Sequence, residues 1–167
     1  MTVAAAAGFA LRALAPADRD AVAVMTRATG VFRDDEIPVA LEVFDSAVSP
    51  AGAEWYQALG AEVDGALAGW ICWGPTPCTL GTYDLYWLVV DPARHGRGIG
   101  TGLLEAMERA LAGRARLIVV ETSGREGYRG TRAFYAARGY RETARIPGFY
   151  APEDDQVVFT KVLASPS

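Results

Sequence analysis

Hydrophobic positions at helical spacing predict four helices. In the clearest case Leu103, Leu104, Met107 and Leu111 recur three or four residues apart, as on one face of an α-helix. One helix is expected to open at Pro16-Ala17-Asp18, a second to run from Asp34-Asp35-Glu36 to near Ser49-Pro50, a third to contain the leucine pattern and end at about Gly113, and a fourth to run from Thr131 to Arg138.

Shorter apolar runs predict seven strands, which are Phe9–Arg12, Trp55–Val63, Ala66–Trp73, Thr82–Val90, Arg116–Thr122, Tyr140–Ile146 and Gln156–Leu163. Asp64-Gly65 is a strong hairpin signal between the second and the third. Loops are expected over Ser123–Gly130 and Pro147–Asp155. The order βααβββαβαββ requires a mixed sheet, because a hairpin joins antiparallel strands and a crossover helix joins parallel neighbours.

The stretch from Asp84 to Leu104 joins the central strand to the third helix through a glycine loop. Directly before the helix, glycines occupy alternate positions: Gly96, Gly98, Gly100 and Gly102. Glycine lets backbone N–H groups approach an anion closely, and a helix N-terminus adds unpaired donors with partial positive charge. Since Arg94, His95 and Arg97 are nearby, the stretch predicts a cradle for a phosphate or a pyrophosphate.

Length and composition fit one globular domain over residues 1–167, with 51% apolar and 22% charged residues. No apolar run approaches the roughly 18 residues that span a bilayer, and the N-terminus lacks a basic leader, so we expect a cytoplasmic protein without membrane contact. His95 is the only histidine, and Cys72 and Cys78 are the only cysteines. This argues against a metal site, a structural disulfide and a histidine-based catalytic triad.

Charge is distributed unevenly along the chain. Residues 1–90 hold 4 arginines and 11 acidic residues, a net charge of −7, whereas residues 91–167 hold 11 arginines, 1 lysine and 9 acidic residues, a net charge of +3. The basic half contains the glycine loop, which favours an anionic ligand there and an amine ligand facing the other half. Chance distribution over a solvated surface is the alternative. The acidic total argues against nucleic-acid binding.

The glycine loop fits neither of two common phosphate motifs. A dinucleotide-binding turn needs G-x-G-x-x-G, but counting from Gly96 or Gly98 places Thr101 or Leu103 at the third glycine. A Walker loop needs a lysine after its second glycine, and the only lysine is Lys161. A turn selected for its geometry alone explains one or two glycines but not four before a helix.

Two motifs, in this order, carry a family resemblance. The first motif follows an apolar strand: His95 to Gly100 reads H-G-R-G-I-G, close to the pattern [Q/R]-x-x-G-x-[G/A]. The second motif runs from Phe134 to Tyr140 and fits the pattern F-Y-x-x-x-G-[F/Y]. A strand ending at Glu121 lies between the two motifs. From about Leu67 to its end, the chain thus resembles the GNAT acetyltransferases. The resemblance implies an α/β (α+β) fold with a mixed, mostly antiparallel central sheet flanked by helices. It also implies an acyl-CoA site and acetyl-CoA as co-substrate.

The resemblance also implies which residues hold the donor. In the family, the backbone of the strand before the loop pairs with the pantetheine arm, and the loop holds the pyrophosphate. The corresponding residues are Leu88, Val89 and Val90 on the strand, and His95, Gly96, Arg97, Gly98, Ile99, Gly100 and Thr101 in the loop. The chain departs from the family at His95, where Gln or Arg is usual. Tyr128 stands where an asparagine often contacts the pantetheine.

Acetyl transfer to an amine needs a path for the amine proton and a proton for the leaving thiolate. Tyr135 matches the family tyrosine near the CoA sulfur, and a phenol with a pKa of about 10 can donate there; core packing is its alternative. Asp84 stands where some relatives carry a glutamate base, and a structural role at the strand end is equally open. Glu121 and Glu36 are weaker candidates for the base.

The acceptor pocket is expected from the early helices, the central strand and the late loop, where aromatic rings can cover an apolar part and carboxylates can hold an amine. The residues selected are Phe32, Glu36, Trp87 and Tyr150. We therefore expect direct acetyl transfer from acetyl-CoA to a primary amine of a small molecule or to an exposed protein amine. A non-catalytic acyl-CoA-binding sensor is the alternative. The acceptor, the acyl length and the oligomeric state stay open, with a homodimer among the assemblies considered.

Overall fold

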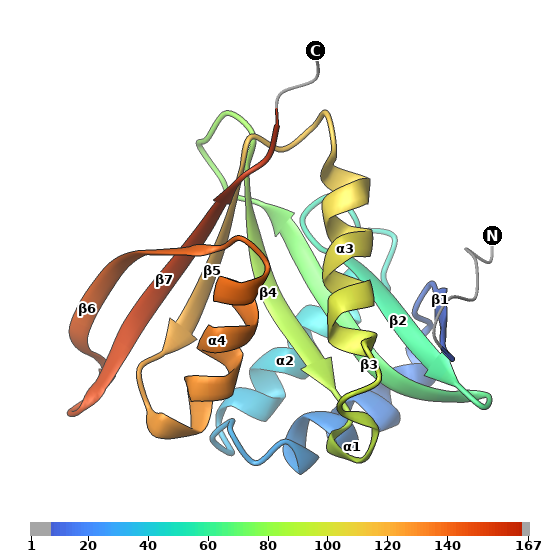
Figure 1. Ribbon diagram of the computed structural model, residues 1–167. Coiled ribbons are helices and arrows are strands. Elements are labelled where there is room, and N and C mark those ends of the chain that lie inside the picture. Colours follow the sequence, from blue (N-terminus) through green and yellow to red (C-terminus); the bar gives the residue numbers. More distant parts are fainter. Residues whose placement is uncertain (1–7, 165–167) are drawn as a thin grey trace. The chain divides into compact units, whose positions relative to one another are not determined.

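The computed structural model describes residues 8–164 and contains the predicted helices and strands in the predicted order (Figure 1). The strands are β1 (Ala10–Arg12), β2 (Gln57–Val63), β3 (Ala66–Pro75), β4 (Thr82–Val90), β5 (Leu117–Ser123), β6 (Arg141–Ala151) and β7 (Asp154–Val162). The helices are α1 (Arg19–Ala28), α2 (Glu36–Ala47), α3 (Ile99–Leu111) and α4 (Arg129–Ala137), and the 3₁₀ turns are η1 (Pro16–Asp18), η2 (Pro92–Arg94) and η3 (Glu126–Tyr128).

The strands form a sheet in the order β1-β2-β3-β4-β5-β7-β6. The pairs β1–β2, β2–β3, β5–β7 and β6–β7 are antiparallel, whereas β4 and β5 are parallel and are joined through α3. The hairpin at Asp64-Gly65 forms as expected, with both residues at positive φ. The predicted mixed, mostly antiparallel sheet flanked by helices is confirmed.

The predicted loop over Pro147–Asp155 is wrong. β6 and β7 both extend into this stretch and meet in a tight turn at Glu153, whose φ is +66°. The polar residues and Pro147 in this stretch favoured a loop over a strand. However, β6 is the outermost strand of the sheet, where the missing N–H of a proline can face away from the neighbouring strand. A register shift between Ile146 and Ala151 absorbs the extra residues as a bulge.

Several boundaries differ by two residues from those predicted, including the end of β3, which lies at Pro75 rather than Trp73, and the start of β7, which lies at Asp154 rather than Gln156. α4 begins at Arg129 rather than Thr131, and η3 leads directly into it, so the predicted loop over Ser123–Gly130 is largely helical. β2 begins at Gln57 rather than Trp55, because the preceding residues form a turn.

The chain divides into two compact units. Of the described residues, 8–74 and 86–110 belong to the first unit, and 75–85 and 111–164 belong to the second. β4 therefore contributes its first residues to the second unit and its last residues to the first. The assignment of residues 1–167 to a single domain stays a prediction. Within residues 8–164, none of the helices has the length and apolar character needed to cross a membrane.

In the first unit, α1 and α2 pack on one face of β3, and α3 packs on the other (Figure 1). Trp70 is completely buried in the cluster formed with α1 and α2, and its ring meets Phe44 edge to face at 6.1 Å. Gly69, the preceding residue, points to the opposite face, where a Cβ would lie about 3 Å from Ile99 and Leu103. The small residue lets α3 lie close to the strand, as a strand buried on both faces requires.

A second glycine of the first unit is fixed by packing. A Cβ at Gly102 on α3 would overlap the ring of Phe9, which precedes β1. The ring occupies the space of the missing side chain, so this glycine serves the packing of the first strand against α3.

In the second unit, aromatic rings of α4, of Tyr140 just before β6, and of β7 pack together in the core. Tyr135 on α4 lies 5.5 Å from Tyr140 and 6.2 Å from Phe159 between ring centroids. β7 is largely buried, whereas β6 is exposed from Arg141 to Phe149. The β6–β7 hairpin therefore contributes one covered strand and one exposed edge.

Candidate functional site

The loop between β4 and α3 takes its shape from two glycines. Gly96 and Gly98 have φ angles of +77° and +75°, in the left-handed region that side chains disfavour. A Cβ built on either glycine would meet no atom of the described residues within 4 Å. Backbone conformation, not crowding by the protein, therefore requires both glycines, and the space beside them is open.

The N-terminus of α3 follows directly. The bond that opens the helix joins the Gly102 N–H to the Gly98 carbonyl at 2.9 Å. By helix geometry, the amides of Ile99 and Gly100 have no acceptor within the helix, and they lie at its positive end. Two left-handed glycines followed by such amides provide backbone donors that suit a phosphate oxygen.

Asp91 fixes the start of the loop, although sequence reasoning did not select it. Its carboxylate accepts a hydrogen bond from the Ala93 N–H at 3.0 Å, and its own N–H donates to the Ala68 carbonyl on β3 at 2.9 Å. The first bond shapes η2, and the second ties the loop to the sheet. An aspartate before a proline is a turn signal that could have identified this residue.

The basic residues of the loop differ in their contacts. Nε2 of His95 lies 3.1 Å from the Val90 carbonyl, so the ring reaches back to the end of β4. Arg94 lies 3.9 Å from Asp64 in the β2–β3 turn, a long ion pair. Arg97 is exposed, which leaves a cation beside the two glycines.

The carboxylate of Asp84 is held by a hydroxyl. Oγ1 of Thr76 donates to Oδ2 of Asp84 at 2.7 Å, and the Thr76 N–H donates to the Thr82 carbonyl at 2.9 Å. These bonds close the turn leading into β4 and orient the half-buried carboxylate. Sequence reasoning missed Thr76, because a Gly-Pro-Thr-Pro turn does not show which residue the threonine faces.

Asp84 and Glu121 share one face of the β4–β5 pair. The parallel register sets Asp84 beside Val119, and Glu121 lies two residues further along β5 on the face of Val119. Although the Glu121 side chain is exposed, desolvation by the surrounding groups raises its pKa and the negative charge of Asp84 raises it further, while a hydrogen bond with Gln156 opposes both. Glu121 therefore keeps its proton to a higher pH than an ordinary glutamate does.

Tyr135 is buried, with 4% of its surface exposed, and its ring is surrounded by Phe134, Tyr140 and Phe159. Burial raises the pKa of its hydroxyl, because the apolar surroundings disfavour the phenolate. The phenol therefore keeps its proton at neutral and mildly alkaline pH. The same ring contacts also agree with the alternative, in which Tyr135 only packs in the core.

Two of the residues predicted for the acceptor pocket meet in the first unit. Phe32, between α1 and α2, lies 5.1 Å from Trp87 on β4, with ring planes inclined at 57°. Trp87 stacks in turn on Trp70 at 6.3 Å and 14°. The three rings form an aromatic row that runs from the partly exposed Phe32 and Trp87 to the buried Trp70.

The other two residues have contacts within their own units. Oε2 of Glu36 accepts a hydrogen bond from the Arg33 N–H at 2.6 Å, which caps the start of α2 and accounts for Glu36 without a ligand. Tyr150 belongs to the second unit, where its ring lies 5.0 Å from that of Phe149. The acceptor roles of Glu36 and Tyr150 stay predictions.

Residues 54–142 match the family model described as the acetyltransferase (GNAT) domain. This span is more than half of the chain and contains both the glycine loop and the tyrosine motif. The chain belongs to the GNAT acetyltransferase family. Within this GNAT chain, Tyr128 stands at the position of the usual asparagine and lies in η3, with the guanidinium carbon of Arg125 at 5.4 Å from its ring centroid.

Individual proteins are similar to this GNAT chain to different extents. The mycothiol acetyltransferase of Kineococcus radiotolerans is 33% identical over 142 residues, 83% of this chain and 45% of that protein. The chain thus spans less than half the length of this curated relative. A crystal structure of a GNAT-family protein from Desulfovibrio desulfuricans is 36% identical with a TM-score of 0.86, over 93% of this chain and 99% of that one. The protein yncA from Salmonella typhimurium, solved with its cofactor acetyl-CoA, shares the fold with a TM-score of 0.73 at 17% identity over 96% of each chain.

Proposed function

We propose that this GNAT protein is an N-acetyltransferase that moves an acetyl group from acetyl-CoA directly to a primary amine, on a small molecule or at an exposed protein amine. The proposal rests on the left-handed pair Gly96 and Gly98, which opens onto the N-terminus of α3 with open space beside both glycines. Membership of an acetyltransferase family and the acetyl-CoA bound by yncA support this choice of ligand.

The loop residues fit a pyrophosphate. The N–H groups from Gly96 to Thr101 would donate to its oxygens, and Arg97 would add a positive charge. A side chain at Gly96 or Gly98 would fill the space that the anion needs. The backbone of Leu88, Val89 and Val90 is proposed to hold the pantetheine arm, and the Val90 carbonyl can accept a bond besides that from His95, because a carbonyl oxygen has two lone pairs.

Acetyl-CoA, when bound, supplies an acetyl thioester and a thiolate leaving group. Tyr135 holds a phenolic proton at the sequence position of the family tyrosine, and burial keeps that proton in place through neutral pH. Donation of this proton to the departing sulfur would make Tyr135 the general acid.

The Asp84–Glu121 pair is proposed to receive the amine proton. A base works best when its pKa lies near the working pH, and the pKa of Glu121 is raised above that of an ordinary glutamate. Asp84, oriented by Thr76, contributes a negative charge that can attract the arriving ammonium group. Two carboxylates in different surroundings can thus divide proton acceptance from charge attraction; Asp84 as the base is the competing assignment.

The aromatic row of Phe32, Trp87 and Trp70 indicates which kind of acceptor amine would bind. Phe32 and Trp87 offer ring faces to the apolar part of an acceptor, and ring faces also attract cations. An amine that carries an apolar or aromatic body therefore suits this surface better than a small polar amine.

The test is release of free CoA thiol from acetyl-CoA across a panel of amines. The panel would contain alkyl amines, aralkyl amines, aminoglycosides and peptides with free N-termini, with product mass to confirm N-acetylation. We expect turnover with at least one amine and preference for aralkyl over small polar amines. Binding of acetyl-CoA without turnover on any amine would favour the alternative, a non-catalytic acyl-CoA sensor.

A further inference from the structure

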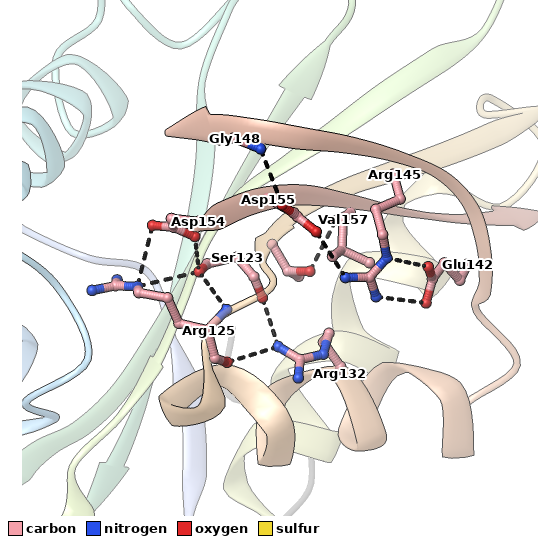
Figure 2. A network of polar contacts seen from close by, with 10 residues as sticks. Ser123, Arg125, Arg132, Glu142, Arg145, Gly148, Asp154, Asp155 and Val157 are labelled. Carbon is pink, nitrogen blue, oxygen red and sulfur yellow. Dashed lines mark hydrogen bonds and ion pairs between the residues drawn. The ribbon is translucent and has the colours of Figure 1, made fainter. Parts of the chain in front are cut away.

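A network of polar contacts in the second unit centres on a carboxylate that has no role in the proposed function (Figure 2). Asp154, the first residue of β7, is 4% exposed. Its Oδ1 accepts from Oγ of Ser123 at 2.5 Å, and its Oδ2 pairs with Nε of Arg125 at 3.2 Å. Oγ of Ser123 also accepts from the N–H and Nε of Arg125, at 3.1 Å and 3.2 Å. One buried carboxylate thus holds the end of β5 and the residues that follow it.

The same connection is held from the other side by α4. Nη1 of Arg132 donates to the Ser123 carbonyl at 2.7 Å and to the Arg125 carbonyl at 2.9 Å. Figure 2 shows Asp154 and Arg132 approaching the connection from β7 and from α4. The connection is therefore held at Ser123 and Arg125 by a strand and by a helix at once.

Along the chain, this connection lies between Glu121 and Tyr135, the two residues to which the proposed function assigns proton transfer. Glu121 precedes Ser123 by two residues on β5, and Tyr135 follows Arg132 by three residues on α4, about one helical turn. A shift of the connection would move the end of β5 relative to the start of α4. The separation of the Glu121 carboxylate and the Tyr135 hydroxyl would change with it.

Burial of a carboxylate disfavours folding unless the charge is paired and hydrogen-bonded, and even then an uncharged packing is often as stable. A hairpin turn does not need such a group. The neighbouring Asp155 shows the ordinary arrangement, since its carboxylate accepts from the Gly148 N–H at 3.0 Å and meets Arg145 at 3.4 Å within the β6–β7 hairpin. Asp154 differs in that its side chain reaches out of the hairpin to the β5–α4 connection.

We propose that Asp154 is a positioning residue which, through Ser123 and Arg125, fixes the β5–α4 connection and so sets the distance between Glu121 and Tyr135. The inference rests on the proposed acetyl transfer and extends it to a residue outside both sequence motifs. It requires that loss of the carboxylate reduces the rate of transfer without weakening the binding of acetyl-CoA.

The first test compares Asp154→Asn with Asp155→Asn, which removes the same charge one residue away. Misplacement by about 1 Å can reduce a rate by about 10²-fold, so Asp154→Asn should reduce kcat by roughly tenfold or more while KM for acetyl-CoA stays within about twofold. Asp155→Asn should keep kcat near wild type. Thermal unfolding of each variant ensures that the assays use folded protein. A lower Tm of Asp154→Asn with unchanged kcat would show that the network is structural only.

A second test asks whether Asp154 acts through Arg125. Arg125→Gln alone leaves a buried carboxylate unpaired and can prevent folding, so the informative protein is the double variant Asp154→Asn/Arg125→Gln. Its kcat should equal that of Asp154→Asn, because both changes break the same link. A further large fall in kcat, or a rise in KM for acetyl-CoA, would mean that Arg125 acts by itself and would overturn the proposal.

Amide hydrogen exchange tests the link without any turnover. Amides of residues 124–128 should exchange faster in Asp154→Asn than in wild type or in Asp155→Asn, and unchanged exchange would contradict the positioning role. If wild type acetylates no amine, the proposed function fails on that result alone, whereas exchange still reports whether Asp154 holds the connection.

Discussion

Asp84 and Glu121 lie on the same face of the parallel β4–β5 pair, and the charge of Asp84 adds to the desolvation that raises the pKa of Glu121. Thr76 meanwhile holds Asp84 by a hydrogen bond of 2.7 Å. The two carboxylates are thus coupled but not equivalent, and a change at either one should be visible in the behaviour of the other.

The first prediction follows from this coupling. Asp84→Asn removes a negative charge beside Glu121, so the pKa of Glu121 should fall. If Glu121 is the base, the acidic limb of the pH profile of kcat/KM should move to lower pH, with kcat largely retained. Glu121→Gln should instead reduce kcat by roughly 10²-fold or more.

The competing assignment gives a different pattern. If Asp84 is the base, Asp84→Asn should lose kcat and recover part of it at high pH, where free amine is more abundant. A rise in the acceptor KM with kcat near wild type would show that Asp84 only attracts the amine. If neither variant changes a kinetic parameter with a true acceptor, the pair has no part in the reaction.

Tyr135→Phe should reduce kcat by roughly 10²-fold or more with little change in acetyl-CoA affinity, because the ring stays packed while the proton donor is lost. Tyr140→Phe is the matched control. Tyr140 is also buried and touches the same ring cluster, and the family pattern accepts phenylalanine there. Equal effects of the two variants, or full activity of Tyr135→Phe when chemistry limits the rate, would remove Tyr135 from the mechanism.

Gly98→Val should weaken CoA binding by roughly tenfold or more, the loss expected for one or two hydrogen bonds to a charged group. The side chain would strain a φ of +75° and fill the open space beside the loop. Gly65→Val is the control, because Gly65 has a φ of +78° and similarly open surroundings in the β2–β3 turn. Calorimetry should show reduced CoA affinity for Gly98→Val alone, and equal affinity of both variants would refute the cradle.

A further prediction concerns stability and pH. Both terminal nitrogens of Arg12 donate to the Asp18 carboxylate, at 2.8 Å and 2.9 Å, and its Nε donates to Glu62 at 2.6 Å. The bonds from Arg12, with a smaller contribution from the Ala15 N–H, hold the pKa of Asp18 below its ordinary value despite its burial. The ionised form thus stabilises the fold above the unfolded pKa of about 4, and this contribution is lost as pH falls through the folded pKa.

Asp18→Asn should therefore lower the free energy of unfolding by about 1–2 kcal/mol at pH 7, because hydrogen bonds to charged groups contribute about 1.5–3 kcal/mol and partial exposure of Arg12 weakens this pair. Urea unfolding at pH 7 and at pH 3 should show the difference from wild type shrinking in acid. Asp20→Asn, a change at an exposed residue of the first turn of α1, should have a much smaller effect at both pH values. A difference for Asp18→Asn that is the same at both pH values would contradict the lowered pKa.

The parts of the fold that sequence reasoning predicted depend on local signals. Asp64-Gly65 adopts positive φ at both residues, the conformation that such a pair favours, and the turn fixes the register of β2 and β3. The late hairpin was missed because Pro147 and Gly148 break a local pattern, although a bulged edge strand tolerates both. Whether a strand is central or at the edge depends on its neighbours in the sheet, which local periodicity does not show.

In the candidate site, too, the features set by local sequence could be predicted, whereas the contacts between distant residues could not. Gly96 and Gly98 are consecutive members of one motif, and their conformation follows from their type. The partner of Asp84 is 8 residues away at Thr76, and the partner of Ser123 is 31 residues away at Asp154. Such pairs form only when strands and turns meet in three dimensions, so residue type and spacing could suggest Asp84 but could not show what holds it.

The contact between Phe9 and Gly102 also has an evolutionary consequence. Because the ring occupies the space of the missing side chain, the two positions cannot change independently. Homologues with alanine or serine at the position of Gly102 should carry a smaller residue at the position of Phe9, and those that keep the glycine should keep a large ring. The residue at position 102, inside α3, would then change together with the residue at position 9. Gly96 and Gly98 would instead be kept or lost together with binding of the ligand.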